Sequence, residues 1–473
     1  MATRKQAVLI VHGMGEQIPM QTLRSFIDTV WTTDDALVRR DRPDSETGES
    51  PRAKNTVWAK PDAAYDNFEL RRVTTERTEN GWRADFYEFY WAHLMHGTTW
   101  QHVTSWLRTL LWRNPRTRVP RPVLATWISL WVIVLLGVFA LLWTSLPMVK
   151  EALPLPAWLG WVLLGVIALS PILLRTVMID RFGDVARYVM AKPANVARRQ
   201  EIRANGVALL ERLIESDEYD RVIVAAHSLG TIVALDILNQ TFARTNKRFN
   251  KDRIGPQPER AKLEAMVRVA LGLEDGEAPE DFTAAYQEQQ KKALAELSSQ
   301  GNPWKVTDFI SMGSPLTHAE FLIAADRDDL RELQRRRVVP CCPPALEYDS
   351  RTGSRHWTYR SGVVRSEGEE FDPVAPRCPH HGAVFGYTRW TNLYSPQSRI
   401  VKGDLISGPV AEPFALERGE KSARGARDIA VLPEGLVTHN HYWNGERRMS
   451  TDAPDKTPEH VRILREILDL DAP

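Results

Sequence analysis

One short stretch near the middle of the chain constrains the fold more than any other. Residues 222–235 read VIVAAHSLGTIVAL, so an apolar run leads to Ser228 and a second apolar run follows at once. The first run is typical of a buried strand and the second of a buried helix. A single hydroxyl between two buried elements indicates a sharp strand–turn–helix connection that presents the serine at the end of the strand. The stretch therefore predicts a fold in which helices pack against a buried sheet.

Strands and helices alternate along the rest of the sequence. Apolar or aromatic runs bounded by turn residues predict strands, and longer amphipathic segments predict helices. The expected strands are 6–12, 68–76, 84–92, 221–226, 305–316 and 388–395, and the expected helices are 20–40, 184–216, 229–243 and 458–470. This alternation is typical of an α/β fold whose sheet is mostly parallel and flanked by helices.

The segment AHSLG, residues 226–230, is a variant of the nucleophile elbow G-x-S-x-G, with Ala226 in the first glycine position. The elbow needs small residues there and at Gly230, because strand and helix cross closely on either side of the serine. The alternative is a chance S-x-G in an ordinary strand–helix turn. If the segment is an elbow, Ser228 is the nucleophile and the backbone N–H of Leu229 helps to form an oxyanion hole.

The N-terminal motif VLIVHGMG, residues 8–15, places Gly13 and Gly15 directly after a short buried strand. In a fold with a nucleophile elbow, the turn after an early strand supplies a second amide to the oxyanion hole. Met14 is the expected donor. The alternative is a phosphate-binding loop, but no G-K-[ST] follows the glycines.

Three further motifs complete a pattern that is spread over most of the chain. They are FISMGSPL at 309–316, RWTNLYS at 389–395 and THNHYW at 438–443. Together with the elbow and the glycine turn, they resemble the motifs of the α/β-hydrolase superfamily, specifically of its lipase- and esterase-like serine hydrolases. The resemblance implies an α/β-hydrolase-like sheet and a Ser-His-Asp triad that works through an acyl-enzyme without a cofactor. It says little about the substrate.

The resemblance implies that the acid lies in the loop after RWTNLYS, which here is PQSRIVKGDLISGPV at 396–410. Relatives often carry an aspartate a few residues after the tyrosine of that strand, where this chain has Ser398. The first carboxylate of the loop is Asp404, which is the expected acid. The alternative is that Asp404 is a solvated turn residue.

The base is implied to come from the late loop VTHNHYWN at 437–444, where His439 and His441 are both candidates. The family pattern resembles H-x-x-Y-W, which favours His439 and leaves His441 open. A base is needed because a serine hydroxyl is a weak nucleophile, and a carboxylate must then fix the tautomer of the imidazole. His12 and His227, beside the glycine turn and the nucleophile, are expected to be structural hydrogen-bonding residues.

Two long runs without charge interrupt this pattern. Residues 123–146 and 152–174 carry no charged side chain, and a helix of either length crosses a hydrocarbon core of about 30 Å. Basic residues are frequent outside the runs, whereas the connecting loop holds only Lys150. The positive-inside rule therefore predicts an integral membrane protein with two spans and a catalytic domain that faces the cytoplasm. The alternative is a buried hairpin in a soluble core.

The two runs divide the chain into three expected parts. Residues 1–122 and 175–473 form the two halves of the hydrolase domain, and 123–174 forms the transmembrane helical hairpin. The second half carries insertions at about 245–304 and 326–386. The charged segment 245–304 is either a lid over an apolar acyl pocket or a solvated helical insertion.

Charge and cysteine content exclude other classes of function. The formal net charge is +1, so no strong field recruits nucleic acid. The three cysteines, Cys341, Cys342 and Cys378, cannot form a disulfide framework, which agrees with a reducing compartment. With His380 and His381 they could approach one another, but the spacing is not that of a standard zinc site. No metal is therefore expected.

The motifs together predict a membrane-anchored serine hydrolase that cleaves carboxylic esters, with a lipid or another acyl ester as the substrate. A lipase or phospholipase is the preferred interpretation because the predicted spans hold the domain against the bilayer. Two alternatives stay open: a thioesterase that acts on acylated proteins, and a non-catalytic membrane binding protein with a degraded hydrolase domain. The sequence does not indicate the oligomeric state.

Overall fold

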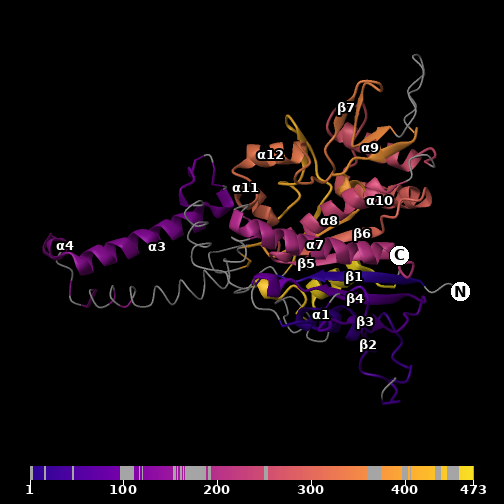
Figure 1. Ribbon diagram of the computed structural model, residues 1–473, viewed down its shortest axis with the longest axis horizontal. Helices are drawn as coiled ribbons and strands as arrows, with labels where there is room; N and C mark the ends of the chain where they lie inside the picture. Colours follow the sequence, from indigo (N-terminus) through magenta and orange to yellow (C-terminus); the bar gives the residue numbers. More distant parts are fainter. Residues whose placement is uncertain are drawn as a thin grey trace.

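The computed structural model has one large sheet at its centre (Figure 1). The described residues are 4–14, 18–44, 47–65, 67–95, 111–116, 118–119, 121–152, 156, 158–159, 162, 165, 188–189, 193–249, 254–360, 374–396, 403–404, 406–431, 438–444 and 457–471. The eight-stranded sheet has the order β14-β11-β6-β5-β1-β4-β3-β2. Its strands are β1 (Lys5–Val11), β2 (Val57–Lys60), β3 (Arg72–Thr75), β4 (Arg83–Phe89), β5 (Arg221–His227), β6 (Val306–Met312), β11 (Arg389–Tyr394) and β14 (Arg427–Ala430).

The sheet is mostly parallel, as the alternation of strands and helices predicts. β1 pairs in parallel with both β4 and β5, and parallel pairing continues through β6 and β11 to β14. At the other edge β2 and β3 pair antiparallel. β5 is buried along its whole length, which fits a Val- and Ala-rich strand that helices cover on both faces. The predicted α/β class with helices flanking a mostly parallel sheet is thus confirmed.

Helices cover both faces of the sheet. The elements concerned here are α1 (Gln21–Ile27), η1 (Asp28–Thr32), α7 (Pro193–Glu215), α8 (Gly230–Lys247), α11 (Ala319–Leu322), α12 (Arg327–Arg335) and α13 (Glu459–Leu468). Leu9 of β1 packs in the same cluster as the apolar residues of α7 and α8, whereas Val8 packs with those of α1, η1 and α13. Neighbouring strand residues point to opposite faces, so one short strand contributes to both halves of the core.

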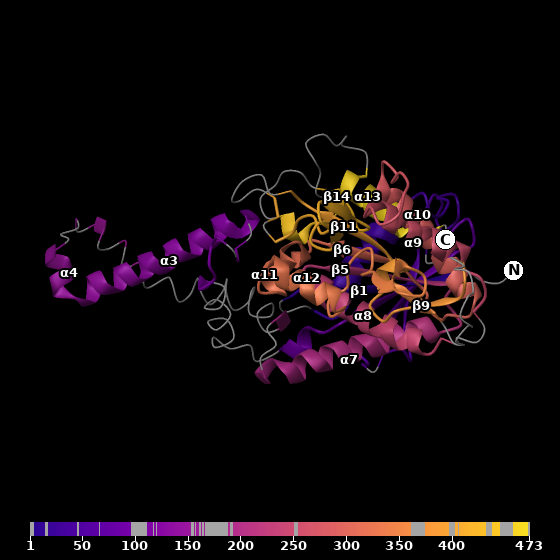
Figure 2. The ribbon, with the colours of Figure 1, turned by 90° about the horizontal axis from the view of Figure 1, so that it is seen from above.

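The expected insertion at 245–304 is helical and packs onto the body. Its helices are α9 (Pro258–Ala270) and α10 (Phe282–Ser299). Tyr286 and Gln290 of α10 each donate a hydrogen bond of 2.7 Å to the main-chain oxygen of Phe385. Figures 1 and 2 place both helices at the end of the sheet away from α11. These contacts favour a fixed insertion over a lid.

The described part of the second expected insertion, 326–386, contains regular elements. Besides α12 it holds two small antiparallel pairs, β7 (Glu347–Asp349) with β8 (Ser354–His356) and β9 (Thr358–Arg360) with β10 (Arg377–Pro379). The buried carboxylate of Glu264 in α9 accepts hydrogen bonds from Arg260, His356 and Thr358. Burial alone would raise the pKa of Glu264, but these donors lower it to about 2. A satisfied ionic cluster thus joins this segment to α9.

The first uncharged run forms α3 (Arg121–Ser145), which α4 (Pro147–Ala152) follows. Figures 1 and 2 both show α3 projecting from the body on the side where α11 lies. Among the residues that the structure describes, no helix meets the length and apolarity required for a membrane crossing. The predicted two-span hairpin is therefore unsupported, and its second run, 152–174, lies mostly outside the described residues.

Candidate active site

The turn after β5 has the predicted sharp geometry. Ser228 adopts φ 52°, a left-handed conformation that non-glycine residues rarely take, and α8 begins two residues later. A Cβ on Gly230 would lie 2.3 Å from the main-chain oxygen of His12, so only glycine lets α8 start this close to the end of β1. Such backbone strain is typical of functional sites. Ser228 is thereby held at the carboxyl edge of the sheet, where parallel α/β folds bind their ligands.

Ser228, His439 and Asp404 form one hydrogen-bonded series, although they are far apart in sequence. Nε2 of His439 lies 2.8 Å from Oγ of Ser228, and its Nδ1 lies 2.9 Å from Oδ2 of Asp404. A carboxylate only accepts hydrogen bonds, so Nδ1 carries the proton and Nε2 is left to accept from the serine hydroxyl. The arrangement is that of a nucleophile, a base and an acid that orients the base.

Asp404 is held as an ionised acid. It is 2% exposed, and its carboxylate accepts hydrogen bonds from the Tyr442 hydroxyl and from the main-chain N–H of Ile406, as well as from His439. Burial alone would raise the pKa of Asp404, but these donors lower it below its ordinary value. Asp404 is therefore a buried group inside the site and not a solvated turn residue.

The two histidines of the late loop point to different partners. His439 reaches Ser228 and Asp404, whereas Nδ1 of His441 lies 3.2 Å from Nδ2 of Asn444. The geometry therefore selects His439 from the two candidates that the sequence leaves open. Tyr442 was part of the H-x-x-Y-W pattern, but the pattern did not assign it a partner in the acid loop.

The glycine turn lies directly against the elbow. A Cβ on Gly13 would lie 3.0 Å from Cβ of Ser228, so the two loops meet in a tight contact at this glycine. Leu229, buried at the start of α8, has a main-chain N–H in the first turn of the helix, where no intrahelical acceptor is available. Met14 follows Gly13 in the described part of the turn, whereas Gly15 lies outside the described residues.

His12 fixes the orientation of the peptide between Gly13 and Met14. Its Nε2 accepts a hydrogen bond of 3.0 Å from the main-chain N–H of Trp91, and its Nδ1 donates one of 2.7 Å to the Gly13 carbonyl oxygen. Burial lowers the pKa of His12 to about 4, so the ring is neutral and can accept at one nitrogen while it donates from the other. The C=O and N–H of a trans peptide point in opposite directions. Because the Gly13 carbonyl oxygen points toward His12, the N–H of Met14 points away from it.

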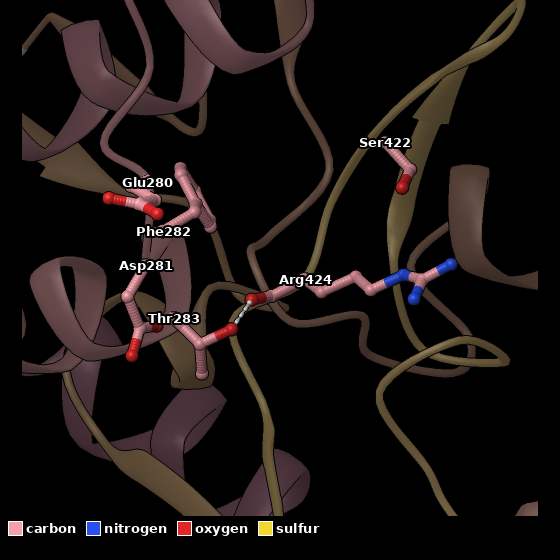
Figure 3. A pocket seen from close by; sticks show the side chains of 6 residues that line it. All are labelled: Glu280, Asp281, Phe282, Thr283, Ser422 and Arg424. Carbon is pink, nitrogen blue, oxygen red and sulfur yellow. Dashed lines mark hydrogen bonds between the residues drawn. The ribbon is translucent and has the colours of Figure 1, made fainter.

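Other features that the sequence raised lie apart from this series. Cys341, Cys342 and Cys378 are buried, and burial raises the pKa of the Cys341 thiol to about 12. Within the described ranges, no group of three or more His, Cys, Asp or Glu side chains is placed to hold a metal ion. Figure 3 shows a pocket at the start of α10. It is lined by Glu280, Asp281, Phe282, Thr283, Ser422 and Arg424, and by none of the residues of the series.

The arrangement can activate an alcohol and stabilise an anion beside it. An imidazole that accepts from a serine hydroxyl and donates to a buried carboxylate takes up the serine proton during attack. Main-chain N–H groups next to the serine can then bind a developing oxyanion.

Comparison of the chain with protein-family models, with curated proteins and with solved structures finds no match.

Proposed function

We propose that the protein is a serine hydrolase that cleaves carboxylic esters. The observation that carries this proposal is the unbroken series from Ser228 through His439 to Asp404, with contacts of 2.8 and 2.9 Å. A degraded domain kept only for binding has no need of a strained serine, a histidine and a buried carboxylate joined by hydrogen bonds. The series therefore favours an enzyme over a binding module.

The proposed reaction has two steps. In the first, His439 takes the proton of Ser228 while Oγ attacks the ester carbonyl, and the main-chain N–H groups of Met14 and Leu229 stabilise the oxyanion. The tetrahedral intermediate collapses when His439 returns the proton to the leaving alcohol, and an acyl group stays on Ser228. In the second step, His439 deprotonates a water that attacks the acyl carbonyl. The bond to Oγ of Ser228 then breaks as His439 returns the proton to that oxygen, and the acid product is released.

We propose a lipid ester as the substrate and a membrane as the place of action, with the catalytic domain on the cytoplasmic side. The support comes from α3, whose exposed apolar side chains lie along most of its length. They include Ile128, Val132, Leu135, Leu136, Leu141 and Leu142. In Figure 1, β1 runs from the N-terminus toward the side from which α3 projects. The parallel strand β5 ends on the same side, so Ser228 and α3 share it.

The segment at the base of α3 supports the same placement. Nη2 of Arg113 donates to the main-chain oxygen of Ala324 at 3.2 Å, and its guanidinium lies 4.7 Å from the ring of Phe321. Phe321 belongs to α11, which follows the carboxyl end of β6. The segment before α3 thus contacts an element that follows the same edge of the sheet as Ser228. A thioester of an acylated protein offers the same acyl group and remains the second candidate substrate.

Labelling with a fluorophosphonate tests the proposal. We expect the unmodified protein to be labelled on Ser228 and to hydrolyse p-nitrophenyl esters, and the Ser228→Ala variant to lose both properties. Ser299→Ala, which alters an exposed serine of α10, is the matched control and retains both. Equal esterase activity in Ser228→Ala and the unmodified protein would contradict the proposal. A series of acyl chain lengths, offered as oxygen esters and as thioesters, then separates the two substrate classes.

A further inference from the structure

His227 connects the proposed nucleophile with the proposed base. Its main chain leads directly into Ser228, and Nε2 of its side chain lies 2.7 Å from the main-chain oxygen of His439. A carbonyl oxygen only accepts hydrogen bonds, so Nε2 of His227 carries a proton and donates it. His227 thus precedes the proposed nucleophile directly in the chain and also hydrogen-bonds to the main chain of the proposed base, which is 212 positions away in sequence.

The surroundings of His227 hold its imidazole in a single state. The ring is buried, and the charged or titratable groups that face it include His439, Asp404, His12 and the phenol of Tyr442. Burial first, and the neighbouring His439 second, lower the pKa of His227 to about 3. The ring therefore stays neutral at working pH, with its proton on Nε2. The ring of Trp443 lies edge-on at 5.0 Å and limits rotation of the imidazole.

The segment that carries the base is short, so its position depends on such ties. His439 lies in a single turn of 3-10 helix, η7 (Thr438–Asn440). The side chain of His439 extends from this turn to Ser228, so a shift of the turn changes the distance between Nε2 and Oγ. Proton transfer is sensitive to that distance, and a misplacement of about 1 Å can reduce a rate by about a hundredfold.

We propose that His227 is a positioning residue, which holds the main chain of His439 where the imidazole meets the hydroxyl of Ser228. This inference rests on the proposed function, since it concerns the same site. The side chain of His227 does not exchange a proton with the substrate. Its loss therefore weakens the chemical step and leaves substrate binding largely unchanged.

Two variants separate the hydrogen bond from simple packing. His227→Leu fills the space with an apolar side chain and removes the hydrogen-bond donor. We expect kcat to fall by about ten- to a hundredfold, with KM within about twofold of the unmodified value. His227→Gln restores an N–H at a similar reach, and we expect it to recover most of kcat. His460→Leu is the matched control. His460 is also buried and lies 3.0 Å from a main-chain oxygen of the same C-terminal segment, that of Asn444, but away from Ser228.

The kinetic outcomes decide the inference in either direction. If His227→Leu keeps the unmodified kcat, or if His227→Gln is as impaired as His227→Leu, the inference is wrong. If His460→Leu loses kcat to the same extent as His227→Leu, the effect is general destabilisation and the inference is again wrong. Recovery in His227→Gln together with an unaffected His460→Leu supports it.

A spectroscopic measurement keeps this inference separate from the proposed function. Nitrogen-15 spectra of the histidine rings in the Ser228→Ala protein need no catalysis. We expect the His227 signal to show a neutral ring protonated at Nε2 from about pH 5 to about pH 9. A ring that titrates within this range overturns the inference even if Ser228 is labelled. Absence of labelling in the unmodified protein, with the expected His227 signal, overturns the proposed function alone.

Discussion

Tyr442 donates its hydroxyl proton to Oδ2 of Asp404 at 2.7 Å, the same oxygen that accepts from Nδ1 of His439 at 2.9 Å. The hydroxyl oxygen of Tyr442 in turn accepts a hydrogen bond of 3.1 Å from the main-chain N–H of Ser395, at the end of β11. One buried phenol thus ties the acid to the sheet and to the segment that carries the base. This phenol thus helps to hold Asp404 where its carboxylate meets His439.

The Tyr442→Phe substitution removes this tie with little change of volume. A hydrogen bond to a buried charged group contributes about 1.5–3 kcal/mol, so we expect the free energy of unfolding to fall by about that amount and kcat/KM by about tenfold. Urea unfolding and ester hydrolysis measure the two effects. Tyr348→Phe, at an exposed position, should change neither. An unchanged kcat/KM in Tyr442→Phe would show that Asp404 is positioned without the phenol.

The close approach of α8 to β1 predicts a strong effect at Gly230. A Cβ there would lie 2.3 Å from the main-chain oxygen of His12, and a contact between fixed main-chain atoms cannot relax cheaply. We expect Gly230→Ala to destabilise the fold by more than about 3 kcal/mol. Gly137→Ala in α3 is the contrasting change, since a Cβ there meets nothing within 4 Å and alanine favours a helix by about 1 kcal/mol. Similar melting temperatures for the two variants would contradict the packing described here.

Buried neutral histidines predict how stability depends on pH. Burial lowers the pKa of His380 to about 4, below the ordinary value of about 6.5. The unfolded chain therefore takes up the proton first as pH falls, and the free energy of unfolding decreases from about pH 6.5 to about pH 4. His12 and His227 contribute with the same sign.

His380→Gln tests this dependence outside the candidate site. Each such histidine contributes at most roughly 1.4 kcal/mol per pH unit, and we expect the variant to unfold with a correspondingly shallower slope over this window. Urea unfolding at several pH values measures the slope. A slope equal to that of the unmodified protein would mean that His380 is not protonated more easily in the unfolded chain.

The exposed side chains of α3 predict binding to lipid. Leu135 and Leu136 are 58% and 54% exposed, and burying a leucine contributes about 1.5–3 kcal/mol. We expect the Leu135→Asp, Leu136→Asp double variant to bind phosphatidylcholine–phosphatidylserine vesicles at least about tenfold more weakly in a flotation assay. Ser299→Asp on α10 is the control for added charge, and hydrolysis of a water-soluble ester should persist in both. Undiminished vesicle binding by the double variant would contradict a lipid-facing role for α3.

The central strands could be predicted from sequence because they are continuous apolar runs. β1 and β5 lie within one residue of the expected ranges 6–12 and 221–226. The edge strands β2 and β14 were not expected, since their residues are largely exposed and form no apolar run. The helix expected over 20–40 shortens to α1 and η1, which end where Asp34 and Asp35 follow.

The candidate site was predictable to the extent that motifs mark it. Ser228 and the glycine turn follow local patterns, whereas the choice between His439 and His441 and the role of Asp404 depend on how distant loops meet. The contacts of His227 with the base and of Tyr442 with the acid join segments that no local pattern relates. Burial also decides the neutral state of His12 and His227, and a single sequence does not reveal burial of a polar residue at a turn.

The first strand, β1, has a consequence for how the protein is made. It lies between β4 and β5, and Gln6 of β1 pairs with Arg221 of β5. The ribosome must therefore release the nascent chain well beyond residue 221 before both edges of β1 are paired. Until then the apolar strand β1 has an unpaired edge, and unpaired edges are prone to aggregation. The order of strands therefore delays completion of the sheet, and with it assembly of the candidate site, until both halves of the chain are present.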